Sequence, residues 1–580
     1  MKSLFIHPPL RSVDTPSSAI PEISGYIKSA GYETTILDLN IDFYNQILTN
    51  ENIEKTKKYC ESILDNQINC KDTIKKQVFD NYKPEIIKYI SGQVEKAKNI
   101  LRSAEFYDTA KYKLAHFIIN KALLLLSLPY DTFILHERSI IGHFDRFSVD
   151  LYKKIAKDPI YNIFYKYFEN KINEILSEKP DSIFILVDIE GQLIPALTLS
   201  QLLKNNGFKN VILMGNYIPL IQDELKSDPT FFEEYSTFAM YENHALAVKD
   251  FLLYLENKLE INKVRNLLYV ENHKVIENKY SYEEPTTFFV QDFEFTKNTK
   301  YFFPELVLPL LLTQGCYWGK CKFCDLFSEK YIKKNIDFVI EEIKYYQKEY
   351  GAKYFFLRDL SFSPSVAKEF SEKIIKNKLD IRYTSFCRFE KEFDYKLLKQ
   401  LYKSGLRCFN WGLESGSQKV LDDMKKGIDL NIVSKILKNC HKIGIGNKVS
   451  IMYALPGETI EDFNETIKFI INHKKYITSI ADRLFFLKRY SYLFNNLNEY
   501  EMKLPVGKIQ NQYSAAEIFT DFDFSKYMDA INELRNINSI ILGSYDEIML
   551  YLDKKPYIFN KWYQKFVSHQ NKKKFNSFFK

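Results

Sequence analysis

The chain has 580 residues, of which 46% are hydrophobic and 27% are charged. These are ordinary globular values, so they exclude a disordered, collagen-like or disulfide-stapled class, and the length predicts several folding units. The net charge of +7 comes from 81 basic and 74 acidic residues dispersed along the chain. This dispersion favours a solvated surface and argues against a nucleic-acid partner.

The cysteines and the apolar runs bear on the location of the protein. Eight cysteines at irregular spacing do not suggest a disulfide framework. The opening MKSLFIHPPLRSVD predicts a strand and not a signal peptide. The apolar runs ALLLLSL and LVLPLLL are shorter than the roughly 20 residues of a membrane helix. We therefore expect a cytoplasmic protein without a membrane span.

The first elements along the chain predict a Rossmann-like domain. A strand at 3–6, a helix at 20–29 and a strand at 34–37 form a β-α-β unit, and the alternation resumes with SIFILVDI after a long stretch of helical spacing. Strands separated by helices predict a doubly wound parallel sheet. We place this domain at 1–45 and 178–275 and a helical insertion at 46–177.

The second half of the chain predicts a barrel. Residues 276–305 lack clear periodicity and read as a connector. Strands and helices then alternate from LVLPLLLT to KVSIMYAL, which predicts a partial (β/α)6 barrel of the TIM type at 306–495, with its functional groups at the carboxyl ends of the strands. Residues 496–580 predict a helical region without a catalytic motif. The predicted fold class is α/β throughout.

Three cysteines gather directly after the first barrel strand. Cys316, Cys321 and Cys324 lie in LLTQGCYWGKCKFCD, where Gly315 and Gly319 allow tight turns. Three thiolates can hold a metal centre and leave one coordination position open to a substrate, because structural zinc and iron–sulfur cubanes commonly take four protein ligands. The loop therefore predicts a metal site at the mouth of the barrel.

Two other interpretations of this loop stay open. A zinc knuckle would take its fourth ligand from elsewhere, for example from His441 or Cys387. The three cysteines could also be unligated. The third cysteine, the flanking glycines and the barrel context favour a cluster.

Three motifs carry a resemblance to a known family. The cysteine loop, FNWGLESGS at 409–417 and ALPGET at 454–459 resemble radical S-adenosylmethionine (SAM) enzymes, although four residues separate the first two cysteines where most of that family has three. The resemblance implies that Cys316, Cys321 and Cys324 bind three irons of a 4Fe-4S cluster. The fourth iron would bind SAM, whose reductive cleavage yields a 5'-deoxyadenosyl radical.

The resemblance also implies further residues of the SAM site. Phe323 matches an aromatic that packs near the adenine, and its alternative role is that of a core side chain. Glu414 matches a contact to the cofactor, and its alternative role is a charge that caps a helix. Other candidates at predicted strand ends are Asp359, Arg388, Pro456 and Gly457.

The N-terminal domain resembles the cobalamin-binding domain that precedes many radical SAM enzymes. Asp38, Leu39 and Asn40 match its second strand end, and Gly215 ends a later strand. The axial-histidine motif Asp-x-His-x-x-Gly is absent from the sequence, so cobalamin would lie without such a ligand in the cleft at the carboxyl edge of the sheet. The alternative is a Rossmann-like domain that has lost its ligand.

Together these resemblances imply a radical SAM enzyme that uses cobalamin, either as a methyltransferase or as a catalyst of another radical modification such as a rearrangement. Its substrate would be a peptide or a small metabolite, and flavodoxin or ferredoxin would donate the electron. Two alternatives remain: a cobalamin-independent enzyme for cyclisation or crosslinking, and a non-catalytic iron–sulfur or zinc protein.

Overall fold

The chain divides into two compact units, Met1–Glu305 and Leu306–Lys580. The predicted helical region at 496–580 lies for the most part outside the residues that the structure describes. No helix in the described part of the chain has both the length and the apolar character to cross a bilayer. The computed structural model describes residues 1–130, 133–136, 139–142, 149–281, 283, 285, 287–325, 331–489, 491–505, 512–519, 527, 549 and 552–554.

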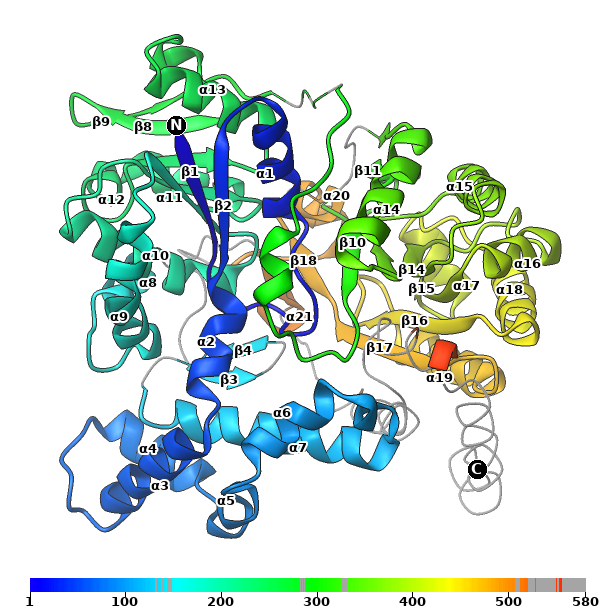
Figure 1. Cartoon of the computed structure of the whole chain (residues 1–580). Coiled ribbons are helices and arrows are strands. Elements are labelled where there is room, and N and C mark those ends of the chain that lie inside the picture. The colour runs from blue at the N-terminus through cyan, green and yellow to red at the C-terminus, as the bar shows by residue number, and fades with distance from the viewer. Residues whose placement is uncertain are drawn as a thin grey trace. The chain divides into compact units, whose positions relative to one another are not determined.

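The first unit is built on a seven-stranded sheet with the order β2-β1-β5-β6-β7-β8-β9 (Figure 1). The strands are β1 (Lys2–His7), β2 (Glu33–Asp38), β5 (Ser182–Leu186), β6 (Val211–Gly215), β7 (Phe238–Tyr241), β8 (Leu267–Glu271) and β9 (Lys274–Glu277). The first five of these strands, β1, β2, β5, β6 and β7, are parallel. The direction in which successive strands are added to the sheet reverses between β1 and β5. This confirms the predicted doubly wound sheet.

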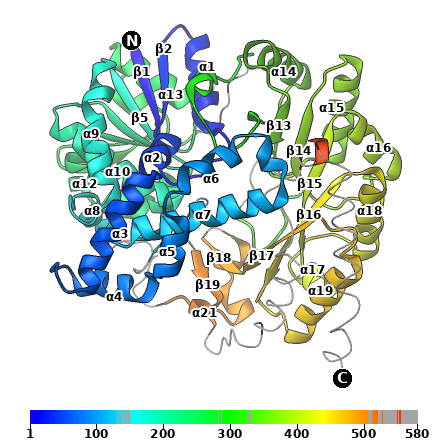
Figure 2. The ribbon, with the colours of Figure 1, turned by 60° about the horizontal axis from the view of Figure 1, so that its bottom comes forward.

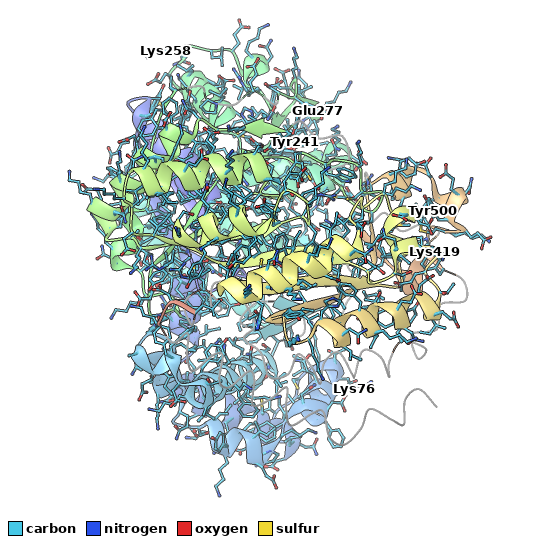
Figure 3. The ribbon with its side chains drawn as sticks, turned by 90° about the vertical axis from the view of Figure 1, so that its right-hand side faces the viewer. Lys76, Tyr241, Lys258, Glu277, Lys419 and Tyr500 are labelled. Carbon is cyan, nitrogen blue, oxygen red and sulfur yellow. The ribbon has the colours of Figure 1, made fainter. Side chains whose placement is uncertain are left out.

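Two antiparallel strands, β8 and β9, extend this sheet beyond the prediction. The Tyr241 hydroxyl at the end of β7 donates a hydrogen bond of 2.8 Å to Glu277 of β9, and both residues are labelled in Figure 3. The short turn at Asn272 and His273, both with positive φ, allows β9 to fold back on β8.

The core of the first unit follows from the apolar central strands. All five residues of β5 are buried, as expected for a parallel strand covered on both faces. Phe5 and Phe184 stack with their ring centroids 5.0 Å apart, and Phe251 meets Phe184 edge-on. The helices of this sheet are α1 (Ala19–Ser29), α10 (Leu193–Asn205), α11 (Gln222–Ser227), α12 (Pro229–Glu234) and α13 (Ala245–Leu255).

The insertion between β2 and β5 is mainly helical, with α6 packed against α7 (Figure 2). A hairpin of β3 (Phe133–His136) and β4 (Ser139–Gly142) interrupts it, where strands were not expected. The run FILHERSIIG contains three isoleucines, whose branched side chains favour strands. The helices are α2 (Leu39–Ile47), α3 (Asn50–Leu64), α4 (Asp72–Asn81), α5 (Pro84–Ile90), α6 (Val94–Leu101), α7 (Thr109–Ser127), α8 (Val149–Ala156) and α9 (Ile163–Ser177).

The second unit contains a six-stranded parallel sheet whose spatial order is its chain order. The strands are β10 (Val307–Leu310), β13 (Tyr354–Leu357), β14 (Arg382–Cys387), β15 (Leu406–Glu414), β16 (Gly446–Tyr453) and β17 (Ser479–Leu484). Because the winding never reverses, all crossover helices lie on one side, which confirms the predicted partial barrel (Figure 2).

The barrel helices begin and end at capping residues. Asn335 caps the N-terminus of α14, and Gly351 ends that helix with a φ of 63°. Thr459 and Asp462 form a reciprocal capping box at the start of α19. The helices are α14 (Ile336–Tyr350), α15 (Pro364–Lys376), α16 (Tyr395–Lys403), α17 (Gln418–Asp423), α18 (Leu430–Ile443) and α19 (Ile460–His473). The shorter elements are β11 (Thr313–Gln314), β12 (Ile332–Lys333), β18 (Phe486–Lys488), β19 (Gln512–Ser514), α20 (Tyr492–Asn495) and α21 (Ala515–Ile518).

An aromatic core supports β15, the strand that carries FNWGLE. Trp411 is fully buried, and its ring stacks on Phe389 at 4.4 Å. Its indole N–H donates to Asn447 of β16 at 2.8 Å. This packing holds the carboxyl end of β15, which carries Glu414.

Candidate functional site

The cysteine loop begins directly after β11, beyond the carboxyl end of β10. Cys316, Cys321 and Cys324 are partly exposed and lie outside any disulfide, and the Cys324 thiol donates to the Asp325 carboxylate at 3.8 Å. Gly315 and Gly319 have φ values of 72° and 57°, a region that glycine enters without strain. The sequence therefore places three thiols outside any disulfide at the edge of the barrel where catalytic groups are expected.

Two cations lie beside this loop. Arg388 Nη1 donates toward Cys321 Sγ at 3.9 Å. Burial raises the pKa of the Cys321 thiol, and the positive charges of Lys426 and Arg388 oppose that shift. Both cations would stabilise a thiolate, which is the form that binds a metal.

The thiols provide the donor chemistry of an iron–sulfur cluster. Among the described residues, no three His, Cys, Asp or Glu side chains are already grouped as metal ligands. Cys387 is buried and donates to the Phe362 carbonyl at 3.3 Å, while the His441 ring packs edge-on to Tyr476. The described part of the chain thus contains no assembled zinc knuckle, and the cysteine loop remains the place where three sulfur ligands could converge.

Glu414 ends β15 in a strained turn and faces Lys426. Its φ is 67°, and the register of β15 against β16 shifts between Gly412 and Glu414. The Glu414 carboxylate accepts from Lys426 Nζ at 2.7 Å, and both side chains are largely buried. A Cβ on Gly412 would lie 2.6 Å from this carboxylate and 2.9 Å from Lys426 Nζ, so a larger residue there would displace the ion pair. Glu414 is therefore an ion-pair partner, and no cap of α17 by its side chain is found in the described structure.

Phe323 connects the cysteine loop with the Glu414 pair. Lys426 Nζ lies 5.7 Å from the centroid of the Phe323 ring. The same ring packs against an apolar cluster of the barrel, so a core role and a role near a cofactor are both compatible with its position. The cluster comprises Val420, Met424, Leu455, Phe485, Leu487, Leu493, Met502 and Ile518.

Asp359 follows β13 and is fully buried. It accepts the Leu312 N–H at 3.3 Å and the Thr313 hydroxyl. Burial raises the pKa of its carboxyl to about 6. Asp359 thus ties the end of β13 to the segment that leads into the cysteine loop.

The ALPGET turn contains a carboxyl group that the sequence analysis did not single out. Pro456 is buried and Gly457 has a φ of 77°. Glu458 Oε2 accepts the backbone N–H groups of Ala454 at 2.6 Å and Leu455 at 3.3 Å, whereas its Oε1 is buried without a hydrogen-bond partner. Burial raises the pKa of Glu458 to about 8. The sequence does carry a signal for Glu458, because it is an acidic residue directly after a Pro-Gly turn at the end of a strand.

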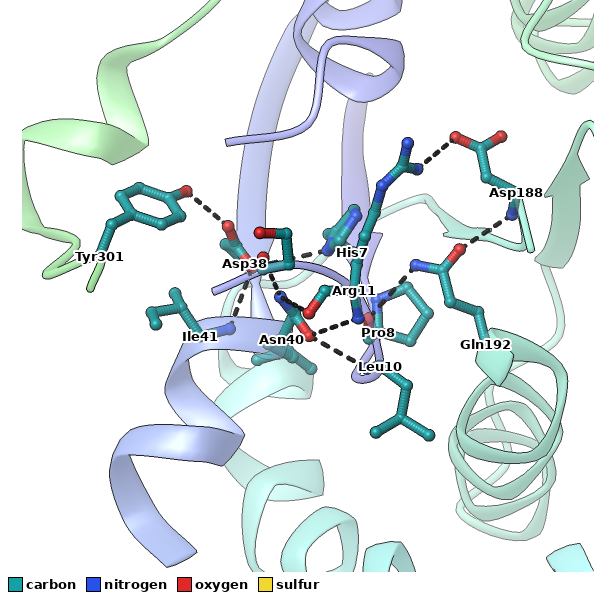
Figure 4. A network of polar contacts seen from close by, with 12 residues as sticks. His7, Pro8, Leu10, Arg11, Asp38, Asn40, Ile41, Asp188, Gln192 and Tyr301 are labelled. Carbon is teal, nitrogen blue, oxygen red and sulfur yellow. Dashed lines mark hydrogen bonds and ion pairs between the residues drawn. The ribbon is translucent and has the colours of Figure 1, made fainter. Parts of the chain in front are cut away.

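In the first unit, Asn40 shapes the loop after β1 (Figure 4). Its Oδ1 accepts the backbone N–H groups of Leu10 and Arg11, both at 3.0 Å. Its Nδ2 donates to the carbonyl oxygens of Ser12 at 3.1 Å and Arg11 at 3.4 Å. Asn40 is therefore engaged in holding the loop that lies at the switch point between β1 and β5.

Asp38 is likewise committed to internal contacts. It accepts from the Tyr301 hydroxyl at 2.5 Å and caps α2 through the Ile41 N–H at 3.3 Å. His7 Nδ1 lies 3.6 Å from the same carboxylate. Although burial opposes the shift, a hydrogen bond and charge from His7, together with hydrogen bonds from Tyr301 and the Ile41 N–H, lower the pKa of Asp38. Leu39, the third matched residue, is buried at the start of α2.

Gly215 lies at the end of β6 with a φ of 139°. A Cβ at this position would approach the Val187 carbonyl oxygen to 2.4 Å, so the packing of β6 on the end of β5 already requires glycine. An ion pair that the sequence did not indicate lies nearby: Arg11 donates to Asp188 at 2.8 Å (Figure 4). Asp188 also accepts from Asn243 at 2.7 Å.

Comparison with known proteins identifies the barrel segment. The sequence model of the Radical SAM superfamily matches residues 310–470. The chain carries a radical SAM domain. This domain contains the cysteine loop, the strand end of Glu414 and the ALPGET turn, in agreement with the resemblance inferred from the sequence.

Curated relatives of the chain include methyltransferases. An uncharacterized methyltransferase of Pyrococcus horikoshii is 28% identical over 165 residues, which are 28% of this chain and 36% of the relative. The bacteriochlorophyllide d C-8(2)-methyltransferase of Chlorobaculum tepidum is 24% identical over 38% of this chain and 47% of its own length. The chain spans less than half the length of these relatives.

A solved structure extends the similarity over nearly the whole chain. The radical SAM methyltransferase TsrM from Kitasatospora setae, solved with cobalamin and a [4Fe-4S] cluster, has a TM-score of 0.53 at 12% identity, covering 98% of both chains. The cobalamin-dependent radical SAM enzyme OxsB has a TM-score of 0.53 at 16% identity, covering 70% of this chain and 65% of its own. At these identities the likeness shows a common fold.

Proposed function

We propose that the protein is a radical SAM enzyme whose cluster is held by Cys316, Cys321 and Cys324. The observation that carries this proposal is the position of three cysteine thiols outside any disulfide, beside Arg388 and Lys426, at the carboxyl edge of a radical SAM barrel. When bound, the cluster supplies one electron for the reductive cleavage of SAM. The loop and its cations supply the ligands and the compensating charge.

Glu414, Lys426 and Phe323 form the proposed SAM site. The Glu414 carboxylate is positioned to receive an ammonium group, and in the described structure Lys426 fills that role. The Phe323 ring offers an apolar face next to the same ion pair. Asp359, Pro456 and Gly457 would shape the neighbouring strand ends, because each lies after a barrel strand.

We further propose cobalamin-dependent methylation of a carbon atom in a peptide or small metabolite, in the cytoplasm, with flavodoxin or ferredoxin as electron donor. The fold shared with TsrM and OxsB and the names of the relatives support this proposal. Cobalamin, when bound, supplies a transferable methyl group. The cleft between β1 and β5 in the proposed domain at 1–45 and 178–275 would hold it.

The residues of this cleft fit a corrinoid bound without an axial histidine. His7 lies at the end of β1, but its side chain is only 5% exposed and faces Asp38. Asn40 and the pair of Arg11 and Asp188 would then present the loop after β1 to the ligand. The proposal keeps the division of the chain into an insertion at 46–177 and a connector at 276–305.

The test is anaerobic reconstitution with iron and sulfide, followed by dithionite and SAM. We expect 5'-deoxyadenosine or S-adenosylhomocysteine by chromatography, and no product from the C316A/C321A/C324A variant. Stoichiometric zinc in the isolated protein, with no SAM cleavage after full reconstitution, would contradict the proposal. Added hydroxocobalamin should give a bound corrinoid spectrum, and failure to bind it would favour the cobalamin-independent alternative.

A further inference from the structure

Arg388 directly follows β14 and is only 4% exposed. Each nitrogen of its guanidinium has a partner in the described structure. Nε donates to the Glu390 carboxylate at 3.0 Å and Nη2 to the Lys426 carbonyl at 2.7 Å, which leaves Nη1 directed at Cys321 Sγ at 3.9 Å. The guanidinium is therefore a cation whose orientation is set by two hydrogen bonds and whose third donor faces a sulfur.

The unusual four-residue spacer between the first two cysteines completes this clamp. The Trp318 ring lies under the guanidinium, with 4.4 Å from the guanidinium carbon to the ring centroid. The Tyr317 hydroxyl donates to Glu390 at 2.9 Å, next to the bond from Arg388. Two residues of the spacer thus contact Arg388 or its carboxylate partner.

The turn at 425–427 locks the tryptophan in place. The Trp318 indole N–H donates to the Lys425 carbonyl at 2.9 Å. Gly427 has a φ of 68°, and a Cβ there would lie 2.1 Å from the Trp318 ring. The loop, the turn and Arg388 therefore form one packed assembly around Cys321.

A fixed cation at a cluster ligand has a defined electrostatic effect. Reduction adds one negative charge to the cluster, and a nearby buried cation favours the more negative state because charge interactions are strong where water is excluded. Hydrogen bonds to ligand sulfurs act in the same direction, since they withdraw electron density from the metal. Both effects raise the reduction potential.

We infer that Arg388, clamped by Tyr317 and Trp318 of the four-residue spacer, is a positioning residue that hydrogen-bonds the Cys321 sulfur and raises the reduction potential of the cluster. The inference rests on the proposed function, because it requires a cluster on Cys321. It assigns Arg388 to the cluster, whereas the sequence had placed it among general SAM-site candidates. It also explains the extra residue of the spacer, which supplies part of the clamp.

The decisive experiment is a redox titration of the reconstituted protein followed by electron paramagnetic resonance. R388Q removes the charge and keeps a planar hydrogen-bonding group. We expect iron and sulfide loading equal to wild type and about tenfold less reduced cluster at a fixed potential, which corresponds to about 59 mV for one electron. R388K keeps the charge but lacks the forked donor geometry of the guanidinium, so its midpoint potential should shift in the same direction by less.

R382Q is the matched control, because Arg382 lies at the opposite end of β14 and binds Asp380 and Asp553. It removes the same charge at the far end of the strand that leads to Arg388, and it should leave the midpoint potential at the wild-type value. Y317F, which removes only the bond to Glu390, should shift the potential slightly toward more negative values. A shift in R382Q as large as in R388Q would overturn the inference.

Cluster loading and midpoint potential together distinguish a failure of the inference from a failure of the proposed function. Wild-type midpoint potentials in loaded R388Q and R388K would overturn the role of Arg388 and leave the enzyme proposal intact. If R388Q does not load, R388K and Y317F decide in the same way: a more negative midpoint supports the inference and an unchanged one overturns it. A wild-type chain that fails to assemble a cluster would overturn the proposed function and the inference together.

Discussion

The two candidate sites differ in how far their side chains are already used within the fold. In the first unit, Asp38 and Asn40 are saturated by internal hydrogen bonds, and Gly215 is required by the packing of Val187. In the second unit, the three cysteines of the loop lie outside any disulfide, and the contacts of Cys321 with Arg388 and of Cys324 with Asp325 are long, at 3.9 Å and 3.8 Å. Matched residues of the first unit are therefore used in hydrogen bonding and packing, whereas those of the second offer ligand atoms.

The difference has a physical basis. Buried carboxylate and amide groups must find hydrogen-bond partners, because an unpaired buried polar group is costly. A thiol is a weak donor and acceptor, so long and weak hydrogen bonds in a folded loop cost it little. Cysteine thiols beside cations thus point to a ligand more directly than a satisfied Asp or Asn does.

The largest effect should follow from removal of single thiols. C316A, C321A or C324A should each lose cluster iron and reduce SAM cleavage to background, because three sulfur ligands are required to hold the cluster. Iron analysis and product chromatography measure this. C70A, at a partly exposed cysteine of the first unit, is the control and should load normally. Full activity in any one of the three variants would remove that residue from the ligand set.

Replacement of Asn40 tests whether the first site is structural. N40A removes the bonds that hold the loop after β1 and should lower the free energy of unfolding by about 2–4 kcal/mol, since buried backbone groups lose their partner. Denaturant unfolding followed by circular dichroism measures it. N40D keeps the acceptor and should lose less. Unchanged stability with lost corrinoid binding would instead make Asn40 a direct ligand contact and weaken the comparison.

Replacement of Glu414 tests the proposed SAM contact. E414Q keeps the shape and removes the charge, so the dissociation constant for SAM should rise about tenfold, or about 1.4 kcal/mol, while iron loading is retained. Calorimetry on the reconstituted protein measures this. E465Q, on the exposed face of α19, is the control and should bind SAM as wild type does. An unchanged affinity in E414Q would leave Glu414 only as the partner of Lys426.

The smallest effect concerns the pH dependence of stability through Glu458. Its pKa is raised by burial from an ordinary value of 4.5 to about 8. Between these values the folded chain keeps a proton that the unfolded chain releases, so this group lowers stability as pH rises. E458Q should flatten that part of the slope in thermal melts between about pH 5 and pH 8. A slope identical to that of wild type would contradict a neutral buried carboxyl.

Much of the fold could be predicted from the sequence because it depends on local patterns. Runs such as SIFIL and the alternation of strands with helices predicted both parallel sheets. The hairpin of β3 and β4 was missed because its short apolar run is ambiguous between helix and strand. The antiparallel strands β8 and β9 were missed because their pairing is decided by neighbours in space.

The site was predictable only where its residues are close in the sequence. The cysteine loop and the strand-end motifs are continuous segments. In contrast, the pair of Arg11 and Asp188 joins residues 177 positions apart, and Lys426 reaches back across 12 positions to Glu414. No spacing rule connects such residues, because the sheet topology alone brings them together.

The sequence by itself determined the two α/β units, the three thiols and their place after the first barrel strand, since hydrophobic periodicity and a nine-residue loop are local properties. The tertiary structure decided which candidates are committed to the fold. It also gives the four-residue spacer its contacts. Tyr317 contacts Glu390 and Trp318 contacts Arg388 only after β14 and the cysteine loop fold together. Long-range packing determines such partners, and a linear sequence motif does not encode that packing.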